Sequence, residues 1–187
     1  MRRGQVRIIG GEWRGRKLSI PEQAAVRPTP DRVRETLFNW LAPVIQGAYC
    51  LDLFAGSGAL GFEALSRGAA EVVMVDQSAV VIKCLRLQCK LLKTTKALIY
   101  QSSIPQQWPV FSKCFDIVFL DPPYSEPLLL PVCFYLEEKG LLSSPAYIYL
   151  ESRKEIAEDE LPKGWQLIKQ KKAGQVGYYL VKREGNT

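Results

Sequence analysis

The stretch Tyr49-Cys50-Leu51-Asp52-Leu53-Phe54-Ala55-Gly56-Ser57-Gly58-Ala59-Leu60-Gly61 decides how this chain folds. Its first six residues are mostly apolar and predict a short buried strand. Gly56 to Gly58 predicts a tight turn, because glycine tolerates sharp backbone bends. Residues 59–67 predict a helix that Gly68 ends. The chain therefore begins its main body with a strand, a glycine turn and a helix.

The same alternation of strands and helices continues after this stretch. Alternation with short connections predicts an α/β, Rossmann-like fold with a mainly parallel, doubly wound sheet. In such sheets, ligands bind beyond the carboxyl ends of the strands. Further strands are expected at 72–76, 97–100, 115–120 and 146–150, helices at 78–92 and 128–139, and a terminal antiparallel hairpin at 165–170 and 176–182.

The first 35 residues show little regular periodicity. A short strand within residues 2–11 and a return strand within 12–18 predict a hairpin. Pro28 and Pro30 enforce an extended segment, and an apolar helical face follows Asp31. We therefore expect an N-terminal basic extension over residues 1–35 and a catalytic domain over residues 36–187.

Charge is unevenly spread along the 187 residues, whose net charge is +6. Residues 1–36 hold nine Lys or Arg and four Asp or Glu, and residues 163–187 hold six and one. The part between them holds ten and fourteen. An acidic centre between two basic ends predicts a catalytic body whose termini grip a polyanion such as nucleic acid. A soluble protein with solvated lysines remains the alternative.

Several function classes are excluded by composition. The chain contains no histidine, which excludes histidine bases and histidine-ligated metals, and we expect no metal. Its five cysteines form no CxxC pair and are expected to be reduced thiols of a cytoplasmic protein. No apolar run is long enough to predict a membrane span.

A nucleotide cofactor site is predicted at the glycine turn. Gly56, Gly58 and Gly61 match the spacing GxGxxG, and Asp76 ends the next expected strand, where it can accept ribose hydroxyls. Taken alone, this fits a nicotinamide oxidoreductase. Asp52, however, would repel a pyrophosphate and attract the positively charged end of S-adenosylmethionine. A glycine turn that binds no ligand remains the alternative.

An amine acceptor site is predicted at Asp121-Pro122-Pro123-Tyr124, directly after the strand at 115–120. The Asp121 carboxylate and the Pro122 carbonyl can each accept one N–H of an exocyclic base amine, which directs the nitrogen lone pair. Tyr124 can stack on the base. Because the strand at 115–120 should neighbour the one at 49–54, the two loops are expected to face one another. A proline turn that closes a buried strand remains the alternative.

These residues together resemble a known pattern. The glycine loop, the acidic strand end and the Asp-Pro-Pro-Tyr tetrapeptide resemble class I amino-methyltransferases of nucleic acids. The N-terminal part resembles, more narrowly, the RsmD family of bacterial 16S ribosomal RNA guanine-N2 methyltransferases. The resemblance spans nearly the whole chain and is densest in Arg7-Ile8-Ile9-Gly10-Gly11, Arg14-Gly15-Arg16-Lys17-Leu18, Arg27-Pro28-Thr29, Asp31-Arg32-Val33-Arg34-Glu35, Leu37-Phe38-Asn39 and Leu51 through Gly61.

The resemblance implies a monomer that uses S-adenosylmethionine and acts on 16S ribosomal RNA or the small ribosomal subunit during assembly. It implies Asp121, Pro122 and Tyr124 as the catalytic group. Ser102-Ser103 departs from the family, which has an acid or amide there, and Asp76 stands where Glu is commoner. The implied cofactor-binding residues are Asp52, Phe54, Gly56, Ser57, Gly58, Asp76, Gln77 and Ser103.

The basic extension predicts an RNA grip. Arginine forks suit phosphates, and glycines between them would leave the backbone free to mould to folded RNA. A solvated basic tail is the alternative for the extension. For the whole chain, the open alternatives are an adenine-N6 or cytosine-N4 methyltransferase, a nicotinamide oxidoreductase and a non-catalytic RNA-binding protein. The residues expected to bind RNA are Arg7, Arg14, Arg16, Lys17, Arg27, Arg32 and Arg34.

Overall fold

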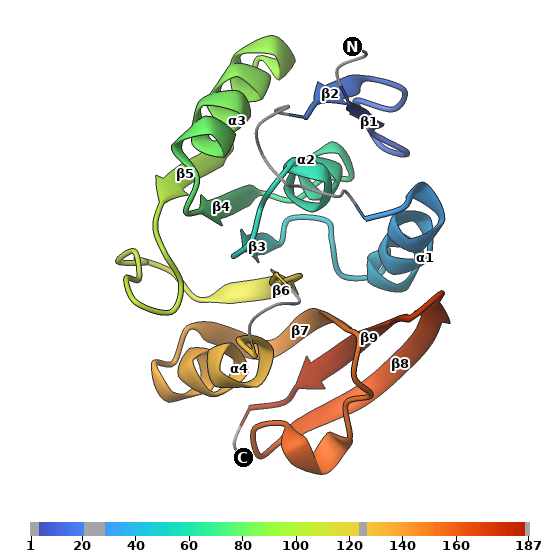
Figure 1. Cartoon of the computed structure of the whole chain (residues 1–187), viewed down its shortest axis with the longest axis vertical. Helices are drawn as coiled ribbons and strands as arrows, with labels where there is room; N and C mark the ends of the chain where they lie inside the picture. The colour runs from blue at the N-terminus through green and yellow to red at the C-terminus, as the bar shows by residue number, and fades with distance from the viewer. Residues whose placement is uncertain (1–3, 21–28, 124–126, 186–187) are drawn as a thin grey trace. The chain divides into compact units, whose positions relative to one another are not determined.

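The structure, a computed structural model, describes residues 4–20, 29–123 and 127–185. Two of the predicted site residues, Arg27 and Tyr124, lie outside the described residues. The chain forms two compact units, Met1–Pro109 and Val110–Thr187, whose elements are labelled in Figure 1. The predicted boundary after residue 35 is a different division of the chain and stays a prediction.

The first unit holds an antiparallel hairpin and a three-stranded parallel sheet. In the sheet, β4 lies between β3 and β5, so the order is β5-β4-β3. The helix α2 packs against β3 and β4, and α3 packs against β4, β5 and the hairpin strand β2. The elements of the first unit are β1 Gln5–Arg7, β2 Lys17–Ser19, α1 Asp31–Leu41, β3 Tyr49–Asp52, α2 Ala59–Ser66, β4 Glu71–Asp76, α3 Ala79–Leu92 and β5 Ala97–Gln101.

The second unit has the strand order β6-β7-β9-β8. The first pair is parallel, and β9 runs antiparallel to both of its neighbours. The predicted α/β fold with mainly parallel strands and an antiparallel C-terminal hairpin is confirmed. The elements of the second unit are β6 Phe115–Leu120, α4 Leu129–Glu138, β7 Leu142–Ser152, the short 3-10 helix η1 Glu158–Glu160, β8 Trp165–Ala173 and β9 Val176–Arg183.

Burial explains why these segments form strands. In β4 the four residues Val72, Val73, Met74 and Val75 are all buried, as expected for a strand covered on both faces. By contrast β5, an edge strand, is only partly buried along its length. Burial of apolar side chains is the main favourable contribution to folding, so β4 anchors the first unit.

One predicted element differs noticeably from the structure. The strand expected at 146–150 begins at Leu142, because Leu142 pairs with Phe115 of β6 before an irregularity in the register. The residues Ser143, Ser144 and Pro145 read as a turn in the sequence. These residues lie where the register with β6 shifts, between the pairs Phe115–Leu142 and Ile117–Tyr147, so they form an irregular part of β7. Within the described residues, no helix is both long and apolar enough to cross a membrane.

Candidate functional site

The turn between β3 and α2 depends on glycine. Gly58 adopts φ +74° at the start of α2, a conformation that side-chain-bearing residues rarely adopt. A Cβ there would also lie 2.6 Å from Leu85 Cδ2 and 2.7 Å from Phe62 Cε2. The turn is closed by hydrogen bonds of 2.7 Å from Gly58 N–H to the Ala55 carbonyl and 2.9 Å from Ala55 N–H to the Val75 carbonyl. The glycine turn is therefore a rigid feature fixed to β4.

Asp52 ends β3 beneath this turn. Its side chain is buried, and its Oδ2 accepts a hydrogen bond of 3.2 Å from the backbone N–H of Gly61 in α2. Burial raises the pKa of Asp52 from 3.8 to about 7, with a smaller contribution from the negative charge of Asp76, while the N–H groups of Gly61 and Phe54 lower it. A positively charged group brought beside Asp52 would favour the ionised carboxylate.

Asp76 ends β4 and holds both neighbouring loops. Its Oδ2 accepts the N–H of Gly56 at 2.9 Å, and its Oδ1 accepts the N–H of Ser78 at 2.8 Å. Burial raises the pKa of Asp76, and these two hydrogen bonds oppose the shift. Each carboxylate oxygen retains a lone pair for a further donor. Asp76 can therefore fix the loops and still accept hydroxyl groups of a ligand.

Two further predicted residues lie next to each other beyond β4 and β5. The hydroxyl of Ser103 lies 3.4 Å from Oε1 of Gln77, and Gln101 Nε2 donates to the Gln77 carbonyl at 3.2 Å. The backbone N–H of Ser102 donates to the Asp76 carbonyl at 3.0 Å. The structure thus gathers Gln77, Ser103 and Asp76 at the carboxyl ends of neighbouring strands.

The remaining two residues of the predicted cofactor group lie in the glycine turn itself. Phe54 is half-buried, and Ser57 is buried with its hydroxyl accepting the Ala59 N–H at 3.4 Å. Two carboxylates, the glycine turn and the amides near them form an acidic cradle. These groups fit S-adenosylmethionine, because its amino acid end carries positive charge and its ribose carries hydroxyl groups that can donate to carboxylates. They fit a pyrophosphate poorly, because Asp52 and Asp76 would repel it.

The Asp-Pro-Pro sequence begins where β6 ends. Asp121 is half-buried, Pro122 is buried and Pro123 is exposed. The prolines fix their own φ angles and offer no N–H donors, so the backbone here presents carbonyl groups. That arrangement suits a group that must accept amine hydrogens. The catalytic roles of Asp121, Pro122 and Tyr124 stay predictions.

Most of the described residues expected to bind RNA are exposed. The guanidinium of Arg16 donates to the Leu91 carbonyl at 2.7 Å, and that of Arg7 lies 3.9 Å from a carboxylate oxygen of Asp31. The exposed members of the predicted group are Arg7, Arg14, Arg16, Lys17 and Arg32. Their side chains are available to phosphates, and their role in RNA binding stays a prediction.

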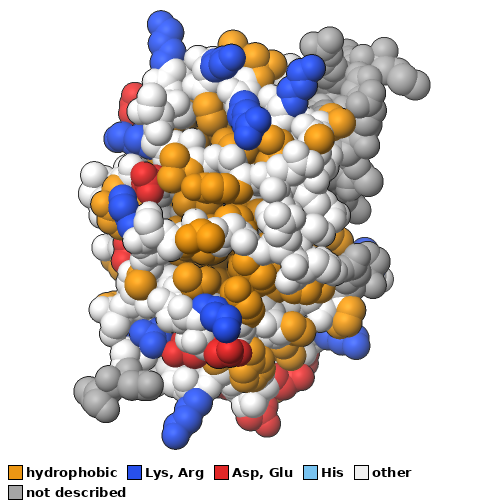
Figure 2. All heavy atoms as spheres, turned by 90° about the vertical axis from the view of Figure 1, so that its left-hand side faces the viewer, with side chains coloured by type: hydrophobic (Ala, Val, Ile, Leu, Met, Phe, Trp, Pro, Cys, Tyr) orange, Lys and Arg blue, Asp and Glu red, His pale blue; other side chains and the backbone are white. Residues whose placement is uncertain are grey.

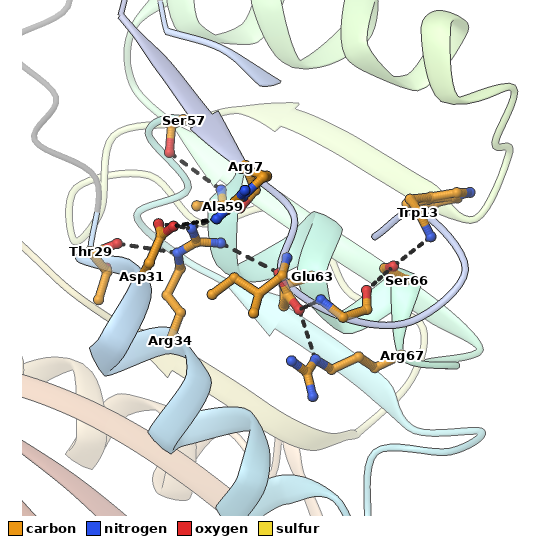
Figure 3. Close-up of polar contacts among 12 residues, drawn as sticks. Arg7, Trp13, Thr29, Asp31, Arg34, Ser57, Ala59, Glu63, Ser66 and Arg67 are labelled. Carbon is orange, nitrogen blue, oxygen red and sulfur yellow. Dashed lines mark hydrogen bonds and ion pairs between the residues drawn. The ribbon is translucent and has the colours of Figure 1, made fainter. Parts of the chain in front are cut away.

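The prediction that Arg34 binds RNA is wrong. Arg34 is completely buried, and its guanidinium donates to the Arg7 carbonyl at 2.8 Å and to Asp31 Oδ1 at 2.6 Å. A third contact joins Nη1 to Oε2 of Glu63 at 3.4 Å (Figure 3). Because no part of this side chain reaches solvent, it cannot contact RNA phosphates. Arg34 instead holds the start of α1 against the rest of the unit.

Glu63 is the centre of this network, and sequence reasoning missed it. Its fully buried carboxylate accepts the N–H groups of Ile9 and Gly10, each at 2.8 Å, and pairs with Arg67 at 2.7 Å (Figure 3). A signal was present in the sequence. Glu63 is the one charged residue of the helix Ala59–Ser66, and a charge among apolar residues needs a buried partner.

The extension is also held by Ser66, so its described part is not the freely moulding backbone that the glycines predicted. The Ser66 hydroxyl accepts the Trp13 N–H at 2.9 Å and donates to the Gly10 carbonyl at 2.6 Å (Figure 3). Gly11 has φ +74°, and a Cβ there would collide with the Ser66 carbonyl. Glycine thus permits close packing here. Within the described residues, no group of His, Cys, Asp and Glu could hold a metal ion.

Comparisons with known proteins give one consistent result. The family model described as "Conserved hypothetical protein 95" matches residues 6–182. The chain is 48% identical over 181 residues to ribosomal RNA small subunit methyltransferase D of Escherichia coli K12, covering 97% of this chain and 91% of that protein. It is 44% identical over 186 residues to the protein of the same name from Haemophilus influenzae Rd, covering 95% and 94%.

A solved structure agrees with these relatives. A protein described as "Putative methyltransferase yhhF from Escherichia coli" superposes with a TM-score of 0.89 at 48% sequence identity. The match covers 98% of this chain and all of the other. Similarity in sequence and in fold therefore extends over both compact units.

Proposed function

The chain belongs to the RsmD family, and we propose on that premise that it transfers a methyl group from S-adenosylmethionine to the exocyclic N2 amine of a guanine in 16S ribosomal RNA. The observation that carries the proposal is the acidic cradle of Asp52 and Asp76 in a chain 48% identical to a ribosomal RNA methyltransferase. S-adenosylmethionine supplies the activated methyl group on a positively charged sulfur.

The cradle residues have distinct proposed roles in holding the cofactor. Asp52 attracts the cationic amino acid end, because a buried carboxylate with a pKa near 7 is stabilised by a nearby positive charge. Asp76 accepts ribose hydroxyls through lone pairs that the Gly56 and Ser78 amides leave free. Gln77 and Ser103 contact the base end, and the glycine turn allows close approach of the backbone.

The Asp-Pro-Pro-Tyr sequence acts on the acceptor amine in this proposal. The Asp121 carboxylate accepts one N–H of the guanine amine, and the Pro122 carbonyl accepts the other. Together they leave the nitrogen lone pair directed at the methyl group, which compensates for its delocalisation into the ring. Tyr124 stacks on the base after it leaves its helix stack.

The partner in this proposal is the small ribosomal subunit, approached by the enzyme as a monomer in the cytoplasm. The relatives named ribosomal RNA small subunit methyltransferase D support the RNA as substrate. The exposed cations Arg7, Arg14 and Arg16 support phosphate contacts, because they are available to solvent. Positioning the base amine beside an activated methyl group needs neither a metal nor a histidine.

The test is a methyl-transfer assay with labelled S-adenosylmethionine and small ribosomal subunits from cells that lack the enzyme. We expect label in N2-methylguanosine after digestion of the RNA to nucleosides. Label in N6-methyladenosine or N4-methylcytidine would contradict the proposed base. Absence of any label, with intact cofactor binding by calorimetry, would indicate a non-catalytic RNA-binding protein. Binding of NAD in place of S-adenosylhomocysteine would indicate an oxidoreductase.

A further inference from the structure

The outer face of α3 is unusually cationic. Residues 79–96 contain five Lys or Arg and no Asp or Glu. All five cations are exposed, and within the described residues none of them forms an ion pair with a carboxylate. We call them the α3 basic face: Lys83, Arg86, Lys90, Lys93 and Lys96.

The geometry of the helix sets these cations in a row. The buried side of α3 is formed by Val81, Ile82, Leu85, Gln88 and Leu92, so residues 83, 86 and 90 lie on the opposite side. Lys83, Arg86 and Lys90 are three or four residues apart, which is about 5 Å along the helix axis, and Lys93 and Lys96 follow just beyond the C-terminus of α3. That spacing is comparable with the spacing of phosphates along a nucleic-acid strand.

The basic face continues into the N-terminal extension. The guanidinium of Arg16 donates to the Leu91 carbonyl at 2.7 Å, and the Cys84 thiol donates to the Ser19 carbonyl at 3.2 Å. These two contacts hold the β1–β2 hairpin alongside α3, as Figure 1 shows. Arg14 and Lys17 of the same hairpin are exposed. Figure 2 shows Lys and Arg side chains gathered over the upper part of this side, with hydrophobic side chains among them.

Stabilisation of the helix does not account for this charge. Cations favour the C-terminal turn of a helix, where the partial negative charge of the macrodipole lies. That effect explains Lys90 in the last turn. It gives no reason for Lys83 and Arg86, which lie before the last turn of α3. Five like charges also repel one another, so an external anion would stabilise the face.

We propose that the α3 basic face, together with Arg14, Arg16 and Lys17, binds backbone phosphates of the ribosomal RNA substrate. The inference rests on the proposed function and extends it, because it adds α3 to the RNA-binding surface. The helix begins three residues after Asp76 of the cofactor cradle and runs about 20 Å along its 14 residues. In this proposal the RNA follows α3 from the end of the sheet that holds the cofactor cradle towards the opposite end of the sheet.

Exposed apolar side chains border the cations, and they would suit a protein partner, which is the main alternative to RNA. Val80, Leu87 and Leu91 are 41%, 52% and 54% exposed, and such side chains also occur where a protein partner docks. The cations favour RNA, because a face with five positive and no negative charges complements a polyanion. The experiment below therefore also distinguishes RNA from a ribosomal protein as the partner of this face.

The test compares two double variants that each remove two positive charges. Lys83→Gln with Lys90→Gln changes the α3 basic face, and Lys154→Gln with Lys163→Gln is the matched control on exposed lysines of the second unit. Binding is measured from 50 to 200 mM salt with protein-free small-subunit RNA and with small subunits from cells lacking the enzyme. A variant with Arg14→Gln and Arg16→Gln serves as the reference for the extension. Unfolding midpoints and cofactor affinity are measured for every variant.

For the α3 variant we expect binding to both substrates to weaken on the order of tenfold at 200 mM salt, with the salt slope smaller by about 1.5. The control should change less than twofold. An α3 variant that behaves like the control overturns the inference. Weaker binding only to the protein-containing particle also overturns it, because the face would then contact a ribosomal protein. Since binding is measured without methyl transfer, failure of the proposed activity is a separate result.

Discussion

Arg34 and Glu63 form a buried ion pair between α1 and α2. Nη1 of Arg34 lies 3.4 Å from Oε2 of Glu63, and neither side chain has any exposed surface. The same carboxylate accepts the amides of Ile9 and Gly10. One acidic group therefore joins the extension and α1 to the helix that follows the cofactor turn. Removing a charge from water is costly, so the pair depends on all its partners.

The substitution Glu63→Gln should strongly destabilise the protein. It leaves the buried guanidinium of Arg34 without its fully buried anionic partner, and we expect the free energy of unfolding to fall by roughly 3 kcal/mol. Urea denaturation followed by circular dichroism measures the change. The matched control is Glu155→Gln on an exposed acid, which should change stability by less than about 0.5 kcal/mol. Equal stability of the two variants would contradict the stabilising role of the buried ion pair between Glu63 and Arg34.

Stability should fall as pH rises because of Asp52. Its pKa is about 7 in the folded protein and 3.8 in the unfolded chain, so between these values the folded state retains a proton that the unfolded state has released. The free energy of unfolding therefore loses roughly 4 kcal/mol from this group between pH 3 and pH 8. Asp52→Asn cannot ionise and should lack this loss. Parallel pH profiles for the two proteins, measured by urea denaturation, would contradict the prediction.

Cofactor binding should show the opposite dependence on pH. If the ionised Asp52 attracts the cationic end of S-adenosylmethionine, affinity rises with pH and levels off near pH 7. Below that point we expect about a tenfold loss of affinity per pH unit. Calorimetry from pH 5.5 to 7.5 measures it, with Asp52→Asn as the variant expected to bind weakly and without pH dependence. A flat profile for the unsubstituted protein would remove Asp52 from the cofactor site.

Gly58→Ala should disrupt the cofactor turn. The new Cβ combines an unfavourable φ with contacts under 3 Å to Leu85 and Phe62, so we expect a loss of stability above about 2 kcal/mol and weaker cofactor binding. Gly140→Ala is the matched control, because Gly140 also has positive φ but meets no atom within 4 Å. The control should lose about 1 kcal/mol and retain cofactor affinity. Similar results for both variants would show that the turn tolerates a side chain.

Asp121→Asn should reduce turnover while leaving cofactor binding intact. The amide cannot provide the negative charge that stabilises the developing transition state, so kcat should fall by roughly 100-fold or more. The dissociation constant of S-adenosylhomocysteine should stay within about twofold. Asp159→Asn, on an exposed acid of the second unit, is the control and should retain full activity. Loss of cofactor binding with normal turnover per bound enzyme would overturn the role given to Asp121.

The order of strands and helices was determined by local sequence. The apolar run before Gly56, the glycine turn and the helix from Ala59 each follow from residues that are neighbours in the chain. Asp76 was predicted at a strand end for the same reason, and the structure places it there. Asp52 was expected within a strand over residues 49–54, but it ends β3, because Leu53 and Phe54 already belong to the turn. Local pattern is sufficient here because hydrophobic period and glycine conformation act within a few residues.

Only the tertiary structure decided which charged residues face solvent. Arg34 reads as one more cation of a basic segment, yet it is buried because Glu63, 29 residues away, is its partner. Glu63 in turn contacts Ile9 across 54 residues. The shift in the pKa of Asp52 likewise depends on burial beneath α2. Such effects depend on distances between segments far apart in the chain, and no local pattern of residue types contains them.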